Sequence, residues 1–485
     1  QALVCVKMAP ADPAADGTFT GTSPQPSEVK DGACAATPDA AQVAAAPALK
    51  FKHRRTLREV LRAKRLERSD IKPSDWGKFG YGTRDGMLTR PIEYDEQTVP
   101  IERIPAAQAT PQWFFENYSK QQRPVIIEGG CAHWPAMTRW GFDELEERYR
   151  HKEFKVGEDG KGKKIKIKFK YFLDYMRNQT DDNPLYLFET EMDDNVHVNS
   201  LTEDFQVPDI FPDDYLNLMN HDSRPPHRWW CIGPKRSGTT VHTDPLGTSA
   251  WNAVTHGRKH WVLFEPETSK KVAKGKLVKE KSEDDEAIMY FDFLLPRIKK
   301  RHPEVRVYQG LQNPGDIIFV PGRWWHGVLN TEDCVAVTQN YCGPDNFEVV
   351  WKSIRRDREK VAHLWLRNMR KFAPQLHRHA LEMNAHDKFR MRHERRKGER
   401  LQDASSSSSD STDSSTDEAT DVRDAPGIAS VTSPEILLLG AAGGGCKRQR
   451  RQPGLVQDKG KENEMPSKRV RPGDAELPHL QKAEC

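Results

Sequence analysis

Apolar and polar positions change their spacing several times along the chain, and each change predicts a different kind of element. Between about residues 101 and 345, short apolar runs alternate with glycine, proline and frequent tryptophan, which is typical of β-structure with helices around it. Within it, RPVIIEG (123–129) predicts a short buried strand, and PQWFFENY (111–118) predicts the start of a helix. We therefore expect a central α+β domain.

The segment KKIKIKFKYFL (163–173) alternates apolar Ile165, Ile167 and Phe169 with lysines. A period of two predicts a strand with one buried face and one face of ammonium groups. We interpret the lysine row as the solvated face of an edge strand, because lysines at sheet edges discourage pairing with other chains.

Two basic segments have apolar residues at helical intervals. Residues 50–70 place leucine and valine at this spacing among many arginines and lysines, and residues 346–372 repeat the pattern, with helices expected to continue to about residue 400. Two interpretations stay open for these segments. They are solvated amphipathic helices packed on the domain, or they contact nucleic acid or serve nuclear import.

Both ends of the chain have compositions that do not support a core. Residues 1–49 are rich in Ala, Pro, Gly and Ser, and SSSSSDSTDSSTDEATD (405–421) is a polar tract typical of phosphorylation substrates. The predicted organisation is a disordered extension (1–50), a basic helical arm (51–100), the β-rich domain (101–345), basic C-terminal helices (346–400) and a disordered Ser/Asp-rich and basic tail (401–485).

Charge and cysteine usage indicate the compartment. The net charge of +4 conceals basic clusters at KRQRR (447–451) and SKRVRP (467–472), which resemble a bipartite nuclear-import signal and predict a nuclear location. The eight cysteines include no CxxC pair, which fits a reducing environment and argues against a structural zinc site. The aliphatic run at 436–442 is far shorter than the roughly 20 residues that span a bilayer, so we expect no membrane association.

The stretch HTDPLGTSAWNAVTHGRKHWVLF (242–264) places His242 and Asp244 two residues apart. With 17 histidines in the chain, about one such pair is expected by chance, so the context decides. In NPGDIIFVPGRWWHGVLN (313–330), a turn, a strand and a second turn lead to His326. Two imidazoles and one carboxylate are the ligands of mononuclear Fe(II) oxygenases, which leave positions open for co-substrate and O₂. We predict these three residues as metal ligands.

A competing pair is His302 and Glu304, which have the same nominal spacing. They lie in a basic segment with a proline between them, and no third ligand follows as well placed as His326. His326 taken alone would instead be interpreted as a histidine packed among tryptophans.

Lys259 stands in an apolar run and tests the metal hypothesis. The pair His256–Gly257 predicts a hairpin turn, so 251–254 and 259–264 are expected to be antiparallel neighbours. A lysine on an inward apolar face is costly unless it meets an anion. A dicarboxylate co-substrate that chelates iron at one end would supply that anion at the other, and the Thr338 hydroxyl in CVAVTQNY could share it.

These motifs, together with GED, DDNPLYLF, RPPHRWW and RSGT, resemble the Jumonji-C domain of 2-oxoglutarate oxygenases and, within that class, the family of bifunctional arginine demethylases and lysyl hydroxylases. The similarity runs from about residue 52 to 370. It implies a double-stranded β-helix (jelly-roll, cupin) core with flanking helices, and Fe(II) held by His242, Asp244 and His326. The sequence departs from the family's pattern at Thr243, between the first two ligands, and at Gly327, after the last histidine. Neither departure removes a ligand.

The resemblance also implies a site and a reaction. The residues carried over for 2-oxoglutarate are Tyr186, Thr239, Asn252, Lys259 and Thr338, with Asn340 lining the pocket. The implied reaction consumes O₂ and 2-oxoglutarate, releases succinate and CO₂, and hydroxylates C5 of lysyl side chains in nuclear Arg/Ser-rich splicing proteins and in histone tails. Demethylation of N-methylarginine is the nearer alternative. A nuclear scaffold that binds single-stranded RNA through residues 52–68 and 352–400 is the farther one, and whether the chain forms a homo-oligomer stays open.

Overall fold

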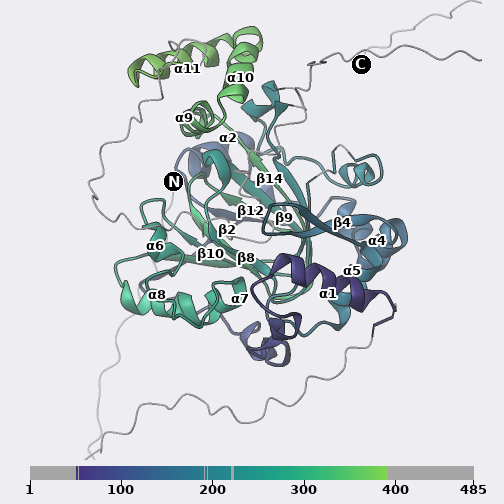
Figure 1. Cartoon of the computed structure of the whole chain (residues 1–485). Coiled ribbons are helices and arrows are strands. Elements are labelled where there is room, and N and C mark those ends of the chain that lie inside the picture. Colours follow the sequence, from purple (N-terminus) through teal and green to yellow (C-terminus); the bar gives the residue numbers. More distant parts are fainter. Residues whose placement is uncertain (1–50, 53, 191, 194, 220–222, 392–485) are drawn as a thin grey trace, which may run out of the picture. The chain divides into compact units, whose positions relative to one another are not determined.

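The computed structural model describes residues 51–52, 54–190, 192–193, 195–219 and 223–391 (Figure 1). The segments predicted to be disordered, the Ser/Asp tract and both nuclear-import clusters lie outside these residues, and the predicted domain limits stay predictions. No helix in the described ranges combines the length and apolarity that crossing a membrane requires.

In the described part of the chain, the strands form two large sheets and one small sheet. The five-stranded sheet, in the order β1-β11-β10-β13-β8, contains β1 (Thr98–Pro100), β8 (Gly238–His242), β10 (Lys259–Phe264), β11 (Val307–Gln312) and β13 (Trp325–Asn330). The seven-stranded sheet, in the order β2-β3-β12-β9-β14-β7-β6, contains β2 (Glu102–Pro105), β3 (Val125–Glu128), β6 (Leu187–Glu189), β7 (Arg228–Gly233), β9 (Ser249–His256), β12 (Ile317–Val320) and β14 (Cys334–Tyr341). The small sheet pairs β4 (Glu153–Glu158) with β5 (Lys164–Lys168).

The two large sheets pack face to face. One apolar cluster combines Ile318 and Val320 of β12 with Trp261 and Leu263 of β10 and Val328 of β13, so it joins both sheets. Most strand pairs are antiparallel, and β1–β11 and β2–β3 are parallel. The predicted α+β class and the double-stranded β-helix core are therefore confirmed.

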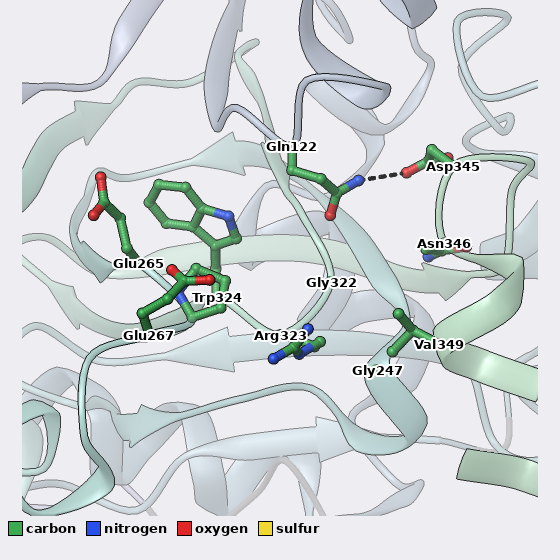
Figure 2. A pocket seen from close by; sticks show the side chains of 11 residues that line it. Gln122, Gly247, Glu265, Glu267, Gly322, Arg323, Trp324, Asp345, Asn346 and Val349 are labelled. Carbon is green, nitrogen blue, oxygen red and sulfur yellow. Dashed lines mark hydrogen bonds between the residues drawn. The ribbon is translucent and has the colours of Figure 1, made fainter. Parts of the chain in front are cut away.

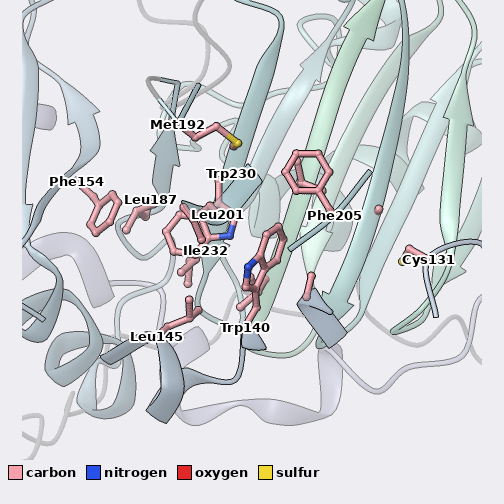
Figure 3. Packing of buried hydrophobic residues seen from close by; sticks show 14 of the residues in the cluster. Cys131, Trp140, Leu145, Phe154, Leu187, Met192, Leu201, Phe205, Trp230 and Ile232 are labelled. Carbon is pink, nitrogen blue, oxygen red and sulfur yellow. The ribbon is translucent and has the colours of Figure 1, made fainter. Parts of the chain in front are cut away.

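The outer face of the seven-stranded sheet is covered by aromatic packing (Figure 3). Trp230 of β7 lies 6.0 Å from Trp140 and 5.5 Å from Phe154, measured between ring centroids. Its neighbours Trp229 and Cys231 belong to a different cluster, because consecutive strand residues point to opposite faces. Each aromatic pair adds roughly 0.5–1.5 kcal/mol beyond the area it buries. This packing fixes the sheet from outside and leaves its inner face for a site.

Helices surround both sheets. Their bounds are α1 (Thr56–Glu67), α2 (Pro111–Phe114), α3 (Ala136–Arg139), α4 (Phe142–Tyr149), α5 (Phe169–Asn178), α6 (Lys270–Ala273), α7 (Ala287–Met289), α8 (Leu295–Arg301), α9 (Phe347–Asp357), α10 (Glu359–Phe372) and α11 (Pro374–His386). Residues of α7 and α8 cluster with Val241 and Val262 of the five-stranded sheet. Helices α9, α10 and α11 pack around Trp351 and Trp365.

The basic helix α1 packs against α5 and β5 (Figure 1). Val60 and Ala63 of α1 join the main apolar cluster. Of the two interpretations of the first basic segment, packing on the domain is therefore confirmed. The predicted strand at residues 163–173 is right for Ile165 and Ile167, which are buried, but it ends at Lys168, and Phe169 begins α5 instead.

The predicted hairpin at His256–Gly257 is wrong. Strand β9 pairs with β12 and β14 in one sheet, whereas β10 pairs with β11 and β13 in the other. The intervening turn therefore carries the chain between sheets. Gly257 has a φ of +71°, and a Cβ there would lie 2.2 Å from the Asp333 carbonyl oxygen, so the crossing requires glycine. A turn rule based on two local residues cannot distinguish a hairpin from a crossing, because distant strands decide which pairs form.

Candidate functional site

The three predicted metal ligands lie together in the described structure. Strand β8 ends at His242, and Asp244 lies two residues after it. His326 is opposite His242 in the register of β8 with β13. One Asp244 carboxylate oxygen lies 4.0 Å from Nε2 of His242 and 3.8 Å from Nε2 of His326. All three candidate ligand atoms lie within 4.8 Å of one another, which is close enough to surround one metal ion.

Each imidazole ring is oriented by a hydrogen bond to the backbone carbonyl two residues earlier in the chain. Nδ1 of His242 contacts the Thr240 carbonyl oxygen at 2.7 Å, and Nδ1 of His326 contacts the Trp324 carbonyl oxygen at 3.0 Å. A carbonyl can only accept, so each Nδ1 carries the hydrogen and each Nε2 keeps its lone pair for a metal. Nε2 of His242 is buried and has no partner among the described residues.

Burial tunes the charges of these ligands. It lowers the pKa of both His242 and His326 to about 4, and it raises the pKa of Asp244 above its ordinary value. The imidazoles are therefore neutral at physiological pH, which is the form that binds metal. Two neutral imidazoles, one carboxylate and an orphaned buried nitrogen fit Fe(II) in a three-ligand site.

The buried lysine lies at the start of β10. Lys259 is 2% exposed, and its Nζ donates to the Tyr186 hydroxyl at 3.0 Å and to the Asn330 amide oxygen at 2.7 Å. Both partners are neutral, so the ammonium charge has no carboxylate partner in its hydrogen-bond shell within the described part of the chain. An uncompensated buried cation is unfavourable, and a carboxylate from a ligand would remove that penalty.

The other predicted 2-oxoglutarate residues lie on β8, β9 and β14. Thr338 is opposite Asn252 in the register of β14 with β9, and its hydroxyl donates to the Trp251 carbonyl at 2.9 Å. The Asn252 amide oxygen and the Thr239 hydroxyl are buried without a partner among the described residues. These orphaned polar atoms fit a polar ligand between the sheets.

Asn340 interacts with the predicted metal ligand Asp244. Its amide donates to the Thr248 hydroxyl at 3.0 Å, and a hydrogen bond from Asn340 partly offsets the raised pKa of Asp244. Asn340 is therefore a neighbour of the predicted carboxylate ligand, and its place in the 2-oxoglutarate pocket stays a prediction.

Sequence reasoning missed several residues of the site. Asn330, opposite Lys259 in the register of β10 with β13, accepts from its ammonium, and Trp229 and Cys231 form an apolar cluster with Tyr186. Burial raises the pKa of the Cys231 thiol to about 12, so it is a neutral wall. Asn330 was weakly indicated by the sequence, because it is a polar amide residue at the end of an apolar run. Trp229 and Cys231 were not indicated, because an inner and an outer face of a doubly buried strand look alike in sequence.

The competing pair of His302 and Glu304 follows α8. The two side chains contact each other at 3.2 Å, and the Glu304 side chain is 68% exposed. Among the residues that the structure describes, His242, Asp244 and His326 are the group that could hold a metal ion.

The chain is similar to a known domain family and to several known proteins. The family model described as "Cupin-like domain" matches residues 111–347. The chain is 35% identical over 327 residues to the bifunctional arginine demethylase and lysyl-hydroxylase psr-1 of Caenorhabditis elegans, covering 66% of this chain and 79% of that protein. It is 36% identical over 243 residues to the lysine-specific demethylase JMJ21 of Arabidopsis thaliana (49% and 25% covered), and 24% identical over 297 residues to the 2-oxoglutarate and iron-dependent oxygenase JMJD4 of Danio rerio (56% and 65% covered).

Proposed function

The chain belongs to the family of bifunctional arginine demethylases and lysyl-hydroxylases, which are iron- and 2-oxoglutarate-dependent oxygenases, and from this premise we propose that it hydroxylates C5 of lysyl side chains. Its substrates would be Arg/Ser-rich splicing proteins in the nucleus, with histone tails as further targets. The observation that carries the proposal is the triad of His242, Asp244 and His326 in the same fold as a buried, uncompensated Lys259.

Each group would have a separate task. The triad would hold iron through two Nε2 atoms and one carboxylate, and Lys259 would pair with the far carboxylate of 2-oxoglutarate while Tyr186 and Thr338 offer hydroxyls. Iron and 2-oxoglutarate, when bound, couple reduction of O₂ and decarboxylation to hydroxylation of a nearby C–H bond, giving succinate and CO₂. The burial of the site limits access of bulk water, which strengthens these charge contacts.

N-Methylarginine demethylation is the second candidate. The same chemistry at an N-methyl group yields a hydroxymethyl group that leaves as formaldehyde, so only substrate placement differs. The relative psr-1 is named an arginine demethylase, which supports this candidate, whereas JMJ21 is named a lysine-specific demethylase.

The RNA scaffold is less well supported. Part of the basic character of the first basic segment serves the fold. Lys64 of α1 pairs with Asp181, and Arg68, which follows α1, contacts Asp70, Asp284 and Glu286. Arginines and lysines held in this way are not available for phosphates.

The test is mass spectrometry of two peptides with the full-length protein, Fe(II), O₂ and 2-oxoglutarate. One peptide is rich in Arg, Ser and Lys, and the other is its methylarginine twin; a His242→Ala protein is the control. One added oxygen on lysine, absent with the control, is the expected result. Loss of methyl from arginine would favour demethylation instead, and absence of any 2-oxoglutarate consumption would refute the oxygenase.

A nuclear location rests on the clusters at 447–451 and 467–472. A fluorescent fusion of the full chain should concentrate in nuclei, and replacing the basic residues of both clusters with alanine should return it to the cytoplasm. An unchanged distribution would contradict the proposal.

A further inference from the structure

A cavity of about 390 Å³ has lining residues that are close in sequence to the metal ligands. It is lined by Gln122, Gly247, Glu265, Pro266, Glu267, Gly322, Arg323, Trp324, Asp345, Asn346 and Val349. Gly247 comes three residues after Asp244, and Trp324 comes two before His326. Since consecutive Cα atoms are about 3.8 Å apart, the Cα of Trp324 lies within about 7.6 Å of that of His326. A molecule in this cavity would therefore be near the reacting centre.

Acidic side chains stand on two sides of this cavity (Figure 2). Glu265 and Glu267 follow β10 on one side, and Asp345 precedes α9 on the other. Glu265 accepts from the Tyr308 hydroxyl at 2.7 Å, and Asp345 accepts from the Gln122 amide at 2.9 Å. These neutral donors position the two carboxylates without cancelling their charge.

Nearby cations do not balance this charge. Arg323 is the cationic residue of the lining, and it is exposed to solvent. The Arg306 guanidinium lies 3.7 Å from Glu265, but its side chain is 58% exposed. Exposed pairs of this kind contribute little. Burial raises the pKa of Asp345, so the negative charge of the cavity comes mainly from Glu265 and Glu267, which face one exposed arginine in the lining.

Trp324 is an independent sign of a ligand. Its side chain belongs to a residue that is 5% exposed, and its indole Nε1 has no hydrogen-bond partner among the described residues. In Figure 2 the nitrogen is on the ring edge turned toward Gln122, across the cavity. Tyr308 packs edge to face against the ring at 5.0 Å and holds it there. Several other buried indoles among the described residues also lack an acceptor, but Trp324 lines this cavity, so a peptide carbonyl bound there could accept from its N–H.

We propose that this acidic subsite, defined as Glu265, Glu267, Trp324 and Asp345, binds the side chain of an arginine that flanks the reacting residue of a protein substrate. The inference rests on the proposed function, because it assumes a protein substrate at the triad. A guanidinium presents planar donors that suit carboxylates, and it stacks on indole rings. An extended peptide advances about 3.3 Å per residue, so the arginine would lie roughly two or three residues from the target.

The experiment measures binding without turnover. Labelled lysine-containing peptides carry a single arginine moved through the positions around the target, and each is paired with a twin that has neutral citrulline there. Fluorescence anisotropy is recorded with full-length protein, Fe(II) and 2-oxoglutarate in the absence of O₂. We expect wild-type protein to bind the arginine form about tenfold tighter at one or two positions, as the loss of a charge-assisted pair predicts.

The matched variants are Glu265→Gln with Glu267→Gln, and Glu304→Gln as the control at an exposed carboxylate outside the subsite. The paired variant should lose the arginine preference, and the control should keep it. Thermal unfolding checks that all proteins are folded. Lysine in place of arginine should bind more weakly than arginine, because it cannot make the planar contact.

Two results would overturn the inference. One is equal binding of arginine and citrulline forms by wild-type protein at every position; the other is a preference that survives in the paired variant. Admitting O₂ then tests the proposed function separately. An arginine preference without oxidation of any peptide would leave the subsite standing and refute the proposed reaction.

Discussion

Two lysines are buried to nearly the same degree, yet their surroundings give them different roles. Lys64 of α1 is 5% exposed, lies 2.5 Å from an Asp181 carboxylate oxygen, and is 5.0 Å from the ring centroid of Trp76. Lys259 is 2% exposed and donates to two neutral groups. A buried cation with its own carboxylate is complete within the fold, whereas one without a carboxylate is suited to a ligand. The contrast distinguishes a structural charge from a binding charge.

The largest expected effect is on co-substrate use. Lys259→Ala should lower kcat/KM for 2-oxoglutarate by about a hundredfold or more, because losing one member of a buried ion pair costs about 3–5 kcal/mol. Succinate formation at varied 2-oxoglutarate concentrations measures it. Lys64→Met is the matched control, and we expect its value within about twofold of wild type. Equal losses in both variants would erase the distinction.

The next effect is on stability. Asp181→Asn should lower the free energy of unfolding by about 3 kcal/mol, because it leaves the Lys64 ammonium without its buried partner and weakens the hydrogen bond from the Tyr175 hydroxyl. Chemical denaturation measures this change. Asp143→Asn, at a side chain that is 93% exposed, is the control and should change stability by less than about 0.5 kcal/mol. A drop as small as that of the control would argue against a structural role for Lys64.

Ligand-induced stabilisation sharpens the same contrast. With Fe(II) present and O₂ absent, 2-oxoglutarate at a hundred times its Kd should raise the free energy of unfolding by about 2.7 kcal/mol in wild type. The gain should persist in Asp181→Asn and vanish at that concentration in Lys259→Ala. Denaturation curves with and without 2-oxoglutarate give both values, and a full gain in Lys259→Ala would show that another group binds the carboxylate.

The last expected effect is a pH dependence of stability at the end of α1. Burial raises the pKa of Glu67 to about 8, so the folded state holds a proton that the unfolded state releases near the ordinary value of 4.5. Between these two values the folded state binds more protons, and stability from this group therefore falls as pH rises from about 4.5 to about 8. Glu67→Gln should flatten that part of the stability profile, measured by denaturation at several pH values. Exposed Glu116→Gln should leave the slope unchanged, and an unaltered slope in Glu67→Gln would contradict the assignment.

The sequence was sufficient for features that depend on local order. Ile165 and Ile167 alternate with lysines and are buried in a strand, and the apolar spacing of the first basic segment produced an amphipathic helix that packs on the domain. The period of two in a strand placed His242 and Asp244 on the same face. His326 was located because it follows a predicted turn, strand and second turn. Lys259 was recognisable because a lysine between apolar strand residues needs an explanation.

Other features depended on contacts between distant segments. The turn at Gly257 looks like a hairpin but joins two sheets, because β12 and β14, rather than β10, supply the partners of β9. The acidic subsite combines the end of β10, the turn before β13 and the start of α9, and no local pattern links them.

The sequence by itself determined the chemistry: which side chains could hold a metal, and that a buried ammonium would need an anion. Residue type and strand periodicity are local properties, so they can be read along the chain. Only the tertiary structure decided that Lys64 has a carboxylate and Lys259 has not. The free energy of a buried charge depends on groups within a few ångströms in space, and for both lysines those groups are tens of residues away in the chain.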